Sequence, residues 1–194
     1  RLMFNGKRFF VAALVTLIAA IVILAYGPSR SDPSALLIGF SVAFVAYVLV
    51  TRKQFISWHQ LLIISIGLRI LLLLAPVNWT DDHYRYLWDG LCSTNGISPF
   101  AFTPEELVRT KPEVFTPQHF AELNSPRFHS VYPPAAQLIF ATATSIGGVD
   151  IWRSTLALRV IIILFDLLII VSLGALLKAH VSRVQLVAIY ALNP

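Results

Sequence analysis

The sequence predicts an all-α fold: a polytopic bundle of transmembrane helices with one large folded extracytoplasmic loop that bears short juxtamembrane helices. Apolar residues make up 57% of the 194 residues and charged residues only 13%, whereas soluble domains carry roughly 25% charge. The apolar residues form uncharged blocks close to the roughly 20 residues that a helix needs to cross a bilayer. Seven of the ten acidic residues fall within residues 78–131.

The net charge of +5 does not indicate a nucleic-acid partner. The basic residues form no long run, and most of them flank apolar blocks, where they set membrane topology. The single Cys92 excludes an internal disulfide and a multi-cysteine zinc site.

Three apolar blocks in the first part of the chain predict three spans: Phe9–Tyr26, Ala35–Val50 and Leu61–Val77. The first lacks a small-residue cleavage site after it, so we read it as a span and not as a signal peptide. Three basic residues precede this span, one follows it, and two follow the second span. By the positive-inside rule the N-terminus is cytoplasmic and the segment after residue 77 emerges on the outer face.

The sequence divides into three parts: residues 1–77 with the first spans, an extracytoplasmic loop at 78–131, and further helices at 132–194. Ala135–Val149 is short for a bilayer core of roughly 30 Å. If it crosses fully, Lys178 and Arg183 lie outside, against the positive-inside rule; if it dips in and returns, they lie inside. Leu156–Leu177 is long enough to span, and 184–192 begins another span. The Arg1 start and the Pro194 end, directly after an apolar run, are typical of a piece of a longer protein.

The outer loop begins with a predicted amphipathic helix. Thr80 is placed to cap it, and Tyr84, Leu87, Trp88 and Leu91 form an apolar stripe at i, i+3, i+4 and i+7. Asp81, Arg85 and Asp89 lie on another face at i+4 steps. We expect this helix to lie along the membrane surface with its aromatic side chains toward lipid and its charges toward water.

The rest of the loop carries further helix signals. Thr103-Pro104-Glu105-Glu106 is a capping box with proline at the first helical position, and Thr116-Pro117 repeats this opening. Asn124-Ser125-Pro126 stops the second of these helices. The loop is therefore predicted to fold over the membrane face, and loops of this length are more often functional than not.

Asp81 and Asp82 are the first candidates for chemistry. Paired carboxylates where a span meets water serve as a general base toward an attacking hydroxyl, or hold a divalent cation such as Mg²⁺ or Mn²⁺. The alternative is that they stabilise the first turn of the helix through its dipole. Asp89 alone is expected to be a solvated partner of Arg85.

Arginines within apolar blocks form the second set of candidates. Arg69 and Arg159 each lie inside a predicted span, where a charge is costly and usually faces a cavity, a partner or a polar ligand. Guanidinium groups suit phosphate, but Arg69 and Arg159 could equally reach the interface or pair with Asp166. The five histidines show no metal-ligand spacing. His83 lies within the first of the three stretches described next, and His129 lies shortly before the third. No glycine-rich phosphate loop or nucleophile elbow occurs.

Three sequence stretches together resemble bacterial membrane glycosyltransferases of the GT-C superfamily, in particular mannosyltransferase-like members. They are Asp81-Asp82-His83-Tyr84-Arg85-Tyr86-Leu87-Trp88-Asp89-Gly90, then Asn95-Gly96-Ile97-Ser98-Pro99-Phe100, then Tyr132-Pro133-Pro134 with Gln137. The closing Ala191-Leu192-Asn193-Pro194 is similar to the start of the next motif of that group. The resemblance covers about 78–194, and Ser98 and Cys92 depart from its usual pattern.

The resemblance implies a multi-pass enzyme of the bacterial inner membrane. It would move a mannose-like hexose from a polyprenyl-phosphate donor to a hydroxyl of a glycan or glycolipid acceptor outside the cytoplasm. Asp81 would be the general base. Asp82 would be the second candidate for the base, or would act as a metal ligand or as an orienting group. Arg85, and with it Asp89, Tyr132, Gln137, Arg69 and His129, would bind substrate. The sequence establishes no cofactor; a divalent cation, Mg²⁺ or Mn²⁺, at Asp81 and Asp82 is the candidate. We expect residues 1–194 alone to be inactive.

Two other functions are compatible with the sequence. A transporter or flippase for a lipid-linked or anionic substrate would account for Arg69, Arg159 and Asp166 as residues of a pathway through the bundle. It would not account for a folded outer loop rich in carboxylates. A scaffold subunit that is inactive alone is the third possibility.

Overall fold

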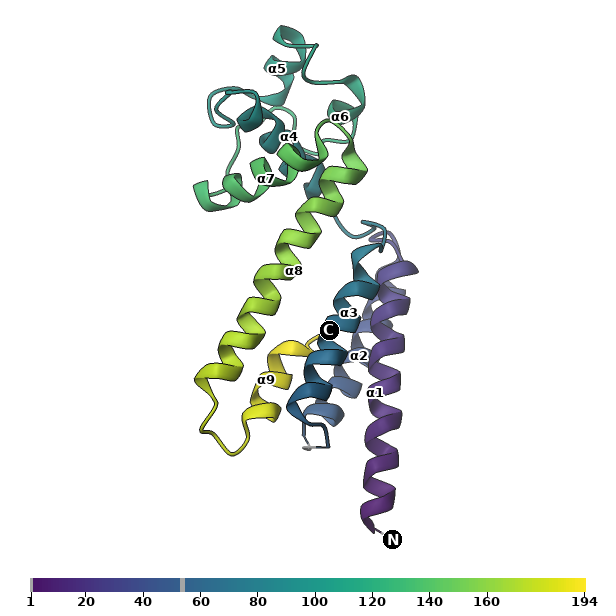
Figure 1. Ribbon diagram of the computed structural model, residues 1–194. Coiled ribbons are helices and arrows are strands. Elements are labelled where there is room, and N and C mark those ends of the chain that lie inside the picture. Colours follow the sequence, from purple (N-terminus) through teal and green to yellow (C-terminus); the bar gives the residue numbers. More distant parts are fainter. Residues whose placement is uncertain (1, 53–54) are drawn as a thin grey trace. The chain divides into compact units, whose positions relative to one another are not determined.

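The computed structural model describes residues 2–52 and 55–194, which in this part of the chain form helices and no strands (Figure 1). The chain divides into two compact units. Unit 1 comprises Arg1–Asn78 and Leu164–Pro194, and unit 2 comprises Trp79–Ile163. The α-helical class predicted from the sequence is confirmed for the described residues.

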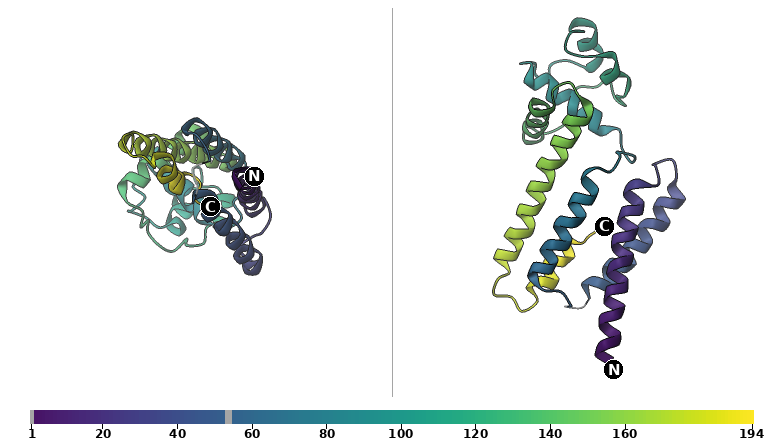
Figure 2. Two further views of the ribbon diagram at one scale, coloured as in Figure 1. Left: turned by 90° about the horizontal axis from the view of Figure 1, so that it is seen from below. Right: turned by 45° about the vertical axis from the view of Figure 1, so that its right-hand side comes forward.

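Unit 1 begins with an antiparallel hairpin of two apolar helices, α1 (Leu2–Tyr26) and α2 (Pro33–Thr51) (Figure 2). Pro33 occupies the first position of α2, where its missing N–H costs no hydrogen bond. Buried small residues, including Ala13 and Ala46, let the helices approach closely. Apart from this seam, many large apolar side chains on both helices are exposed.

Helix α3 (Trp58–Leu73) corresponds to the third predicted span but begins and ends earlier than Leu61–Val77. Ser57 and Gln60 form a capping box that starts the helix three residues before the apolar block. Pro76 disfavours a helical conformation at Ala75, which accounts for the early end. With 16 residues, α3 is about 24 Å long.

Among the residues that the structure describes, three helices are long and apolar enough to cross a membrane: Gly6–Tyr26 within α1, Pro33–Thr51 and Ile151–Leu176. They match three of the spans predicted from the sequence. Helix α3 is apolar but shorter than this criterion. The length and composition of these helices therefore indicate a membrane protein.

The C-terminal part of unit 1 consists of the second half of α8 (Ile151–Leu176) and the short α9 (Arg183–Ala191). The indole of Trp58 packs on Gly174, where a Cβ atom would lie within 2.7 Å of the ring atom Cζ2. On the same indole, the Arg183 guanidinium lies 4.2 Å from the ring centroid, a cation–π contact. These contacts fix α3, α8 and the start of α9 relative to one another.

Unit 2 contains α4 (Asp82–Thr94), α5 (Pro104–Thr110), α6 (Pro117–Ala121), α7 (Pro134–Gly147) and the first half of α8. The capping box of Thr103 and Glu106 is present, and Thr116 caps α6. Trp88 of α4 is buried and stacks on Phe115 at 4.4 Å between ring centroids. The segment after residue 78 therefore has a hydrophobic core of its own, which confirms that it is folded.

Helices α4 and α7 pack closely along each other. The contact centres on Gly90, where a Cβ atom would lie 2.7 Å from the Thr144 hydroxyl oxygen and would also collide with the Phe140 carbonyl. Helix α7 has 14 residues and is about 21 Å long. It ends at Gly148, whose positive φ of 63° turns the chain into α8.

Candidate functional site

The centre of unit 2 is a buried polar network around Asp89. Asp89 is fully buried, and its Oδ1 atom accepts a hydrogen bond of 2.9 Å from Nε of Arg85. Its Oδ2 atom accepts hydrogen bonds from the Ser130 hydroxyl and, at 3.0 Å, from Nε2 of Gln137. Both carboxylate oxygens are thus satisfied, as a buried charge requires.

Arg85 connects α4 to the segment that precedes α7. Its side chain is 4% exposed, and its Nη1 atom donates to the backbone carbonyls of Ser125 at 3.2 Å and Phe128 at 2.9 Å. The expectation that the charges of this helix face water is therefore wrong for Arg85 and Asp89. The physical reason is that the two charges neutralise each other, and that two carbonyls accept from Nη1 of Arg85 while Ser130 and Gln137 donate to Asp89.

Gln137 and Ser130 close the network from α7 and from the loop before it. Besides Asp89, Nε2 of Gln137 donates to the Ser130 hydroxyl oxygen at 2.8 Å, and both residues are buried. Arg85, Asp89 and Gln137, which the motifs singled out separately, thus lie together. Ser130 carried no sequence signal, because a single serine in a loop shows no periodicity or spacing.

Asp81 and Asp82 lie at the N-terminal end of α4, and both are partly exposed. Asp81 is the N-cap residue, but its side chain makes no capping hydrogen bond. The hydroxyl of Thr80 accepts from the backbone N–H of Asp82 at 3.1 Å, so the expected cap is displaced by one residue. Oδ1 of Asp82 accepts from the Asn124 side-chain amide at 3.0 Å.

The imidazole of His83 lies within electrostatic reach of Asp81 and of Arg159. Burial lowers the pKa of His83 and a hydrogen bond with the Thr80 backbone raises it; the charge of Arg159 lowers it, and the carboxylates of Asp81 and Glu122 raise it. A cation of α8 and a carboxylate of α4 thus act on the same histidine. Sequence reasoning missed this association, because Arg159 is 78 residues away along the chain.

An aromatic cluster lies near Asp82. Tyr86 stacks on Phe140 with ring centroids 4.7 Å apart, and Tyr132 meets Tyr86 edge-on at 5.0 Å. Burial, together with the charge of Asp82, raises the pKa of Tyr132 to about 12, so its phenol stays protonated.

The remaining candidates lie elsewhere. His129 is exposed and lies near Glu106, whose pKa it helps to lower after the hydrogen bonds from Thr103. Cys92 is buried, and burial raises the pKa of its thiol to about 12. A buried thiol of this kind does not act as a nucleophile.

Unit 1 holds a separate polar cluster around Arg69. Its Nε atom donates to Oδ2 of Asp166 at 2.6 Å, and its Nη1 atom donates to the Ala191 carbonyl at 2.8 Å and to the Ser65 carbonyl at 3.2 Å. The Tyr190 hydroxyl donates to Oδ1 of Asp166 at 2.8 Å. The sequence left Arg69 and Arg159 as possible partners of Asp166, and the structure shows that Asp166 pairs with Arg69.

Metal ligands are few in the described part of the chain. Within residues 2–52 and 55–194 no group of three or more His, Cys, Asp or Glu side chains lies close enough to hold a metal ion. Asp81 and Asp82 would supply two carboxylates, and a divalent cation there would need substrate oxygens or water to complete its shell.

Comparisons of the chain with protein-family models, curated proteins and solved structures found no match.

Proposed function

We propose that this chain belongs to an integral-membrane glycosyltransferase that takes a hexose from a polyprenyl-phosphate donor and transfers it to a hydroxyl group outside the cytoplasm. The observation that carries the proposal is the position of Asp81 and Asp82. They lie partly exposed at the first turn of a helix whose following turns are held rigidly by the network around Asp89. A preorganised carboxylate of this kind is what a general base requires.

Asp81 is the base in this proposal, because it matches the first member of the acidic pair in the group of enzymes that the sequence resembles; the side chain of Asp82 accepts a hydrogen bond from Asn124. The Asp81 carboxylate takes the proton of the acceptor hydroxyl while that oxygen attacks the anomeric carbon. The new carbon–oxygen bond is the glycosidic bond; the bond between the anomeric carbon and the phosphate oxygen breaks, and its electron pair leaves with the polyprenyl phosphate. Asp82 orients the acceptor or shares a divalent cation with Asp81.

The leaving phosphate needs a cation, and Arg159 is our candidate. Arg85 has its Nε and Nη1 atoms committed to Asp89 and two carbonyls, so we assign it to positioning α4. The charges of Arg159 and Asp81 both act on the His83 side chain, and the proposal assigns Arg159 to the same site as the base on this ground. A guanidinium binds phosphate oxygens in a bidentate manner and stabilises the charge that develops on the leaving group. Tyr86 and Tyr132 would hold the sugar.

The proposed topology places unit 2 outside the cytoplasm. Helix α7 is about 21 Å long and packs along α4, which supports a segment 135–149 that does not cross the bilayer. With α1, α2 and α3 as the first spans, α8 then returns to the cytoplasm. Lys178 and Arg183 become cytoplasmic, in agreement with the positive-inside rule. The proposed topology therefore avoids the conflict with the positive-inside rule that arises if segment 135–149 crosses the bilayer.

The test is sugar transfer in membranes from cells that produce the full-length protein to which this chain belongs, supplied with a radiolabelled polyprenyl-phosphate hexose. Label is expected in glycan or glycolipid only when the protein is present. Arg159→Gln is expected to lower the rate, whereas Arg153→Gln, an exposed position on the same helix, serves as the control. No transfer with any donor hexose, in membranes where the protein is inserted, would contradict the proposal.

The transporter function is favoured by one observation, the Arg69–Asp166 pair between apolar helices. In a structural pair the charges neutralise each other, so the double variant Arg69→Met/Asp166→Leu is expected to be more stable than either single variant, with sugar transfer retained. In a transporter the double variant would be stable but would no longer move its lipid-linked or anionic substrate across the membrane. Thermal unfolding, sugar transfer and substrate transport, measured on the same four proteins, separate the two functions.

A further inference from the structure

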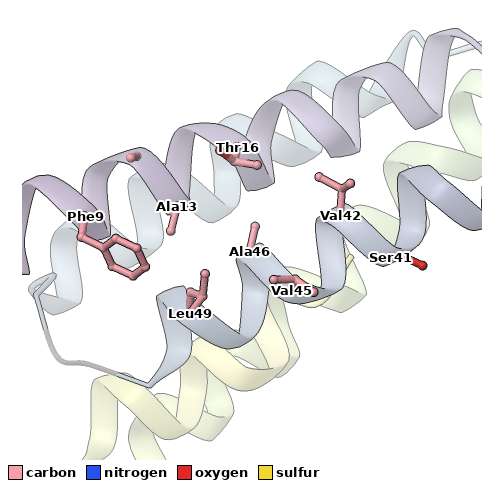
Figure 3. A pocket seen from close by; sticks show the side chains of 9 residues that line it. Phe9, Ala13, Thr16, Ser41, Val42, Val45, Ala46 and Leu49 are labelled. Carbon is pink, nitrogen blue, oxygen red and sulfur yellow. The ribbon is translucent and has the colours of Figure 1, made fainter.

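A groove runs along the surface of unit 1 between α1 and α2 (Figure 3). It encloses about 450 Å³ and is lined by side chains of both helices: Phe9, Ala12, Ala13, Thr16, Ser41, Val42, Val45, Ala46 and Leu49. Only Thr16 and Ser41 among these residues are polar. The Ser41 hydroxyl donates to the carbonyl of Leu37 at 2.7 Å, within its own helix, so it demands no polar partner from an occupant.

The groove leads toward two cations. An adjacent hollow of about 440 Å³ shares Ala12 with the groove and is lined also by Lys7, Arg8 and Val11. From Arg8 to Thr16 the helix rises about 12 Å, so the apolar groove extends over two turns from the charged end. Both Lys7 and Arg8 are exposed.

The charge around this end of the hairpin is one-sided. Because α1 and α2 are antiparallel, Arg52, which follows α2, belongs to the same end as Lys7 and Arg8. The first eighty residues contain a single carboxylate, Asp32, and it lies at the start of α2, at the other end of the hairpin. An occupant with an apolar body and an anionic head would complement both parts of this surface.

We propose that the groove binds one acyl chain of an anionic phospholipid whose phosphate lies against Lys7 and Arg8. An apolar groove open along its length within a membrane-spanning hairpin faces hydrocarbon, and basic residues at the end of a span attract anionic headgroups. A second copy of the chain in a parallel arrangement would bring its own Lys7 and Arg8 against these cations, which disfavours it. The proposal rests on the membrane location of the chain and is independent of the transferase activity.

The test is native mass spectrometry of the detergent-purified protein with phosphatidylglycerol or phosphatidylcholine of the same acyl chains. The wild type is expected to retain phosphatidylglycerol about tenfold better or more, given two basic residues at the headgroup. Lys7→Gln/Arg8→Gln is expected to lower this binding to the level of phosphatidylcholine. The control Lys111→Gln/Lys178→Gln removes the same charge at exposed positions elsewhere and is expected to keep the preference.

A second pair of variants tests the groove itself. Ala12→Leu fills the groove from an exposed position and is expected to lower retention of both lipids, whereas Ala175→Leu, exposed on α8, is expected to leave it unchanged. Equal retention of the two lipids by the wild type, or equal losses in both double variants, would overturn the proposal. So would a dimer that Ala12→Leu dissociates, because the groove would then belong to a second copy. Absence of sugar transfer would contradict only the proposed function.

Discussion

Asp89 lies one helical turn after Arg85 on α4, and the two side chains form an ion pair at 2.9 Å while only 1% and 4% of their surfaces are exposed. The pair is completed by Ser130, Gln137 and two backbone carbonyls. It joins α4, α7 and the loop between them at a single point. The same helix, α4, carries Asp81 and Asp82 at its N-terminal end.

Asp89→Asn is expected to destabilise unit 2 by about 3–5 kcal/mol, because it leaves the Arg85 guanidinium buried without its counter-ion. The control is Glu105→Gln, which removes a partly exposed ion-pair partner of Arg109 and Arg127, whose own side chains are exposed, and is expected to cost about 0–1 kcal/mol. Thermal unfolding of the purified proteins in detergent measures the difference. Equal midpoints for the two variants would mean that the buried pair is not important for the fold.

The stability of unit 2 is expected to fall between about pH 7.5 and pH 5.5. Burial lowers the pKa of both His83 and His119, so the unfolded chain binds these protons more readily than the folded one. The stabilisation is complete above the unfolded histidine pKa of about 6.5 and is lost as the pH falls toward the lower folded values.

The check is the change in unfolding midpoint between the two pH values. It should be smaller in His83→Asn/His119→Asn than in the wild type. The same change in both proteins would assign the pH dependence to other groups.

Labelling of single cysteines tests the proposed topology. An impermeant maleimide added to intact cells, with the outer membrane permeabilised where one is present, is expected to label Ala101→Cys in unit 2 and to leave Ala179→Cys unlabelled until the inner membrane is opened. Both positions are exposed. The native Cys92 is buried with its pKa raised to about 12, so the wild type provides an unlabelled background. Labelling of Ala179→Cys in intact cells would place the end of α8 outside and require segment 135–149 to cross.

Local signals in the sequence predicted much of the fold. The apolar blocks correspond to α1, α2 and α8, and Thr103 and Thr116 begin their helices as expected, because capping involves residues only three apart. The spacing of Leu87, Trp88 and Leu91 predicted an apolar face of α4, but the expectation that this face lies toward lipid is wrong: the three side chains are buried, and Trp88 and Leu91 pack against residues of the same unit such as Phe115. Helix α3 deviates because Pro76 and the capping box at Ser57 act against the apolar pattern.

Tertiary contacts account for what the sequence did not predict. Arg85 and Asp89 lie on the face that the i+4 pattern assigned to water, and only the approach of Ser130 and Gln137 from distant positions makes their burial favourable. The proximity of Arg159 to His83 is likewise a property of the folded unit. Charges that are compensated by remote residues carry no periodic signal in one sequence.

The rate of sugar transfer by Asp81→Asn tests the central claim most directly. Asp150→Asn is the control, because Asp150 precedes α8 in the same unit and its side chain accepts a backbone hydrogen bond from Arg153 that asparagine can also accept. With equal amounts of inserted protein, removal of the general base is expected to lower the rate by about 100-fold or more, and the control to leave it unchanged. A wild-type rate in Asp81→Asn would contradict the assignment of Asp81 as the base.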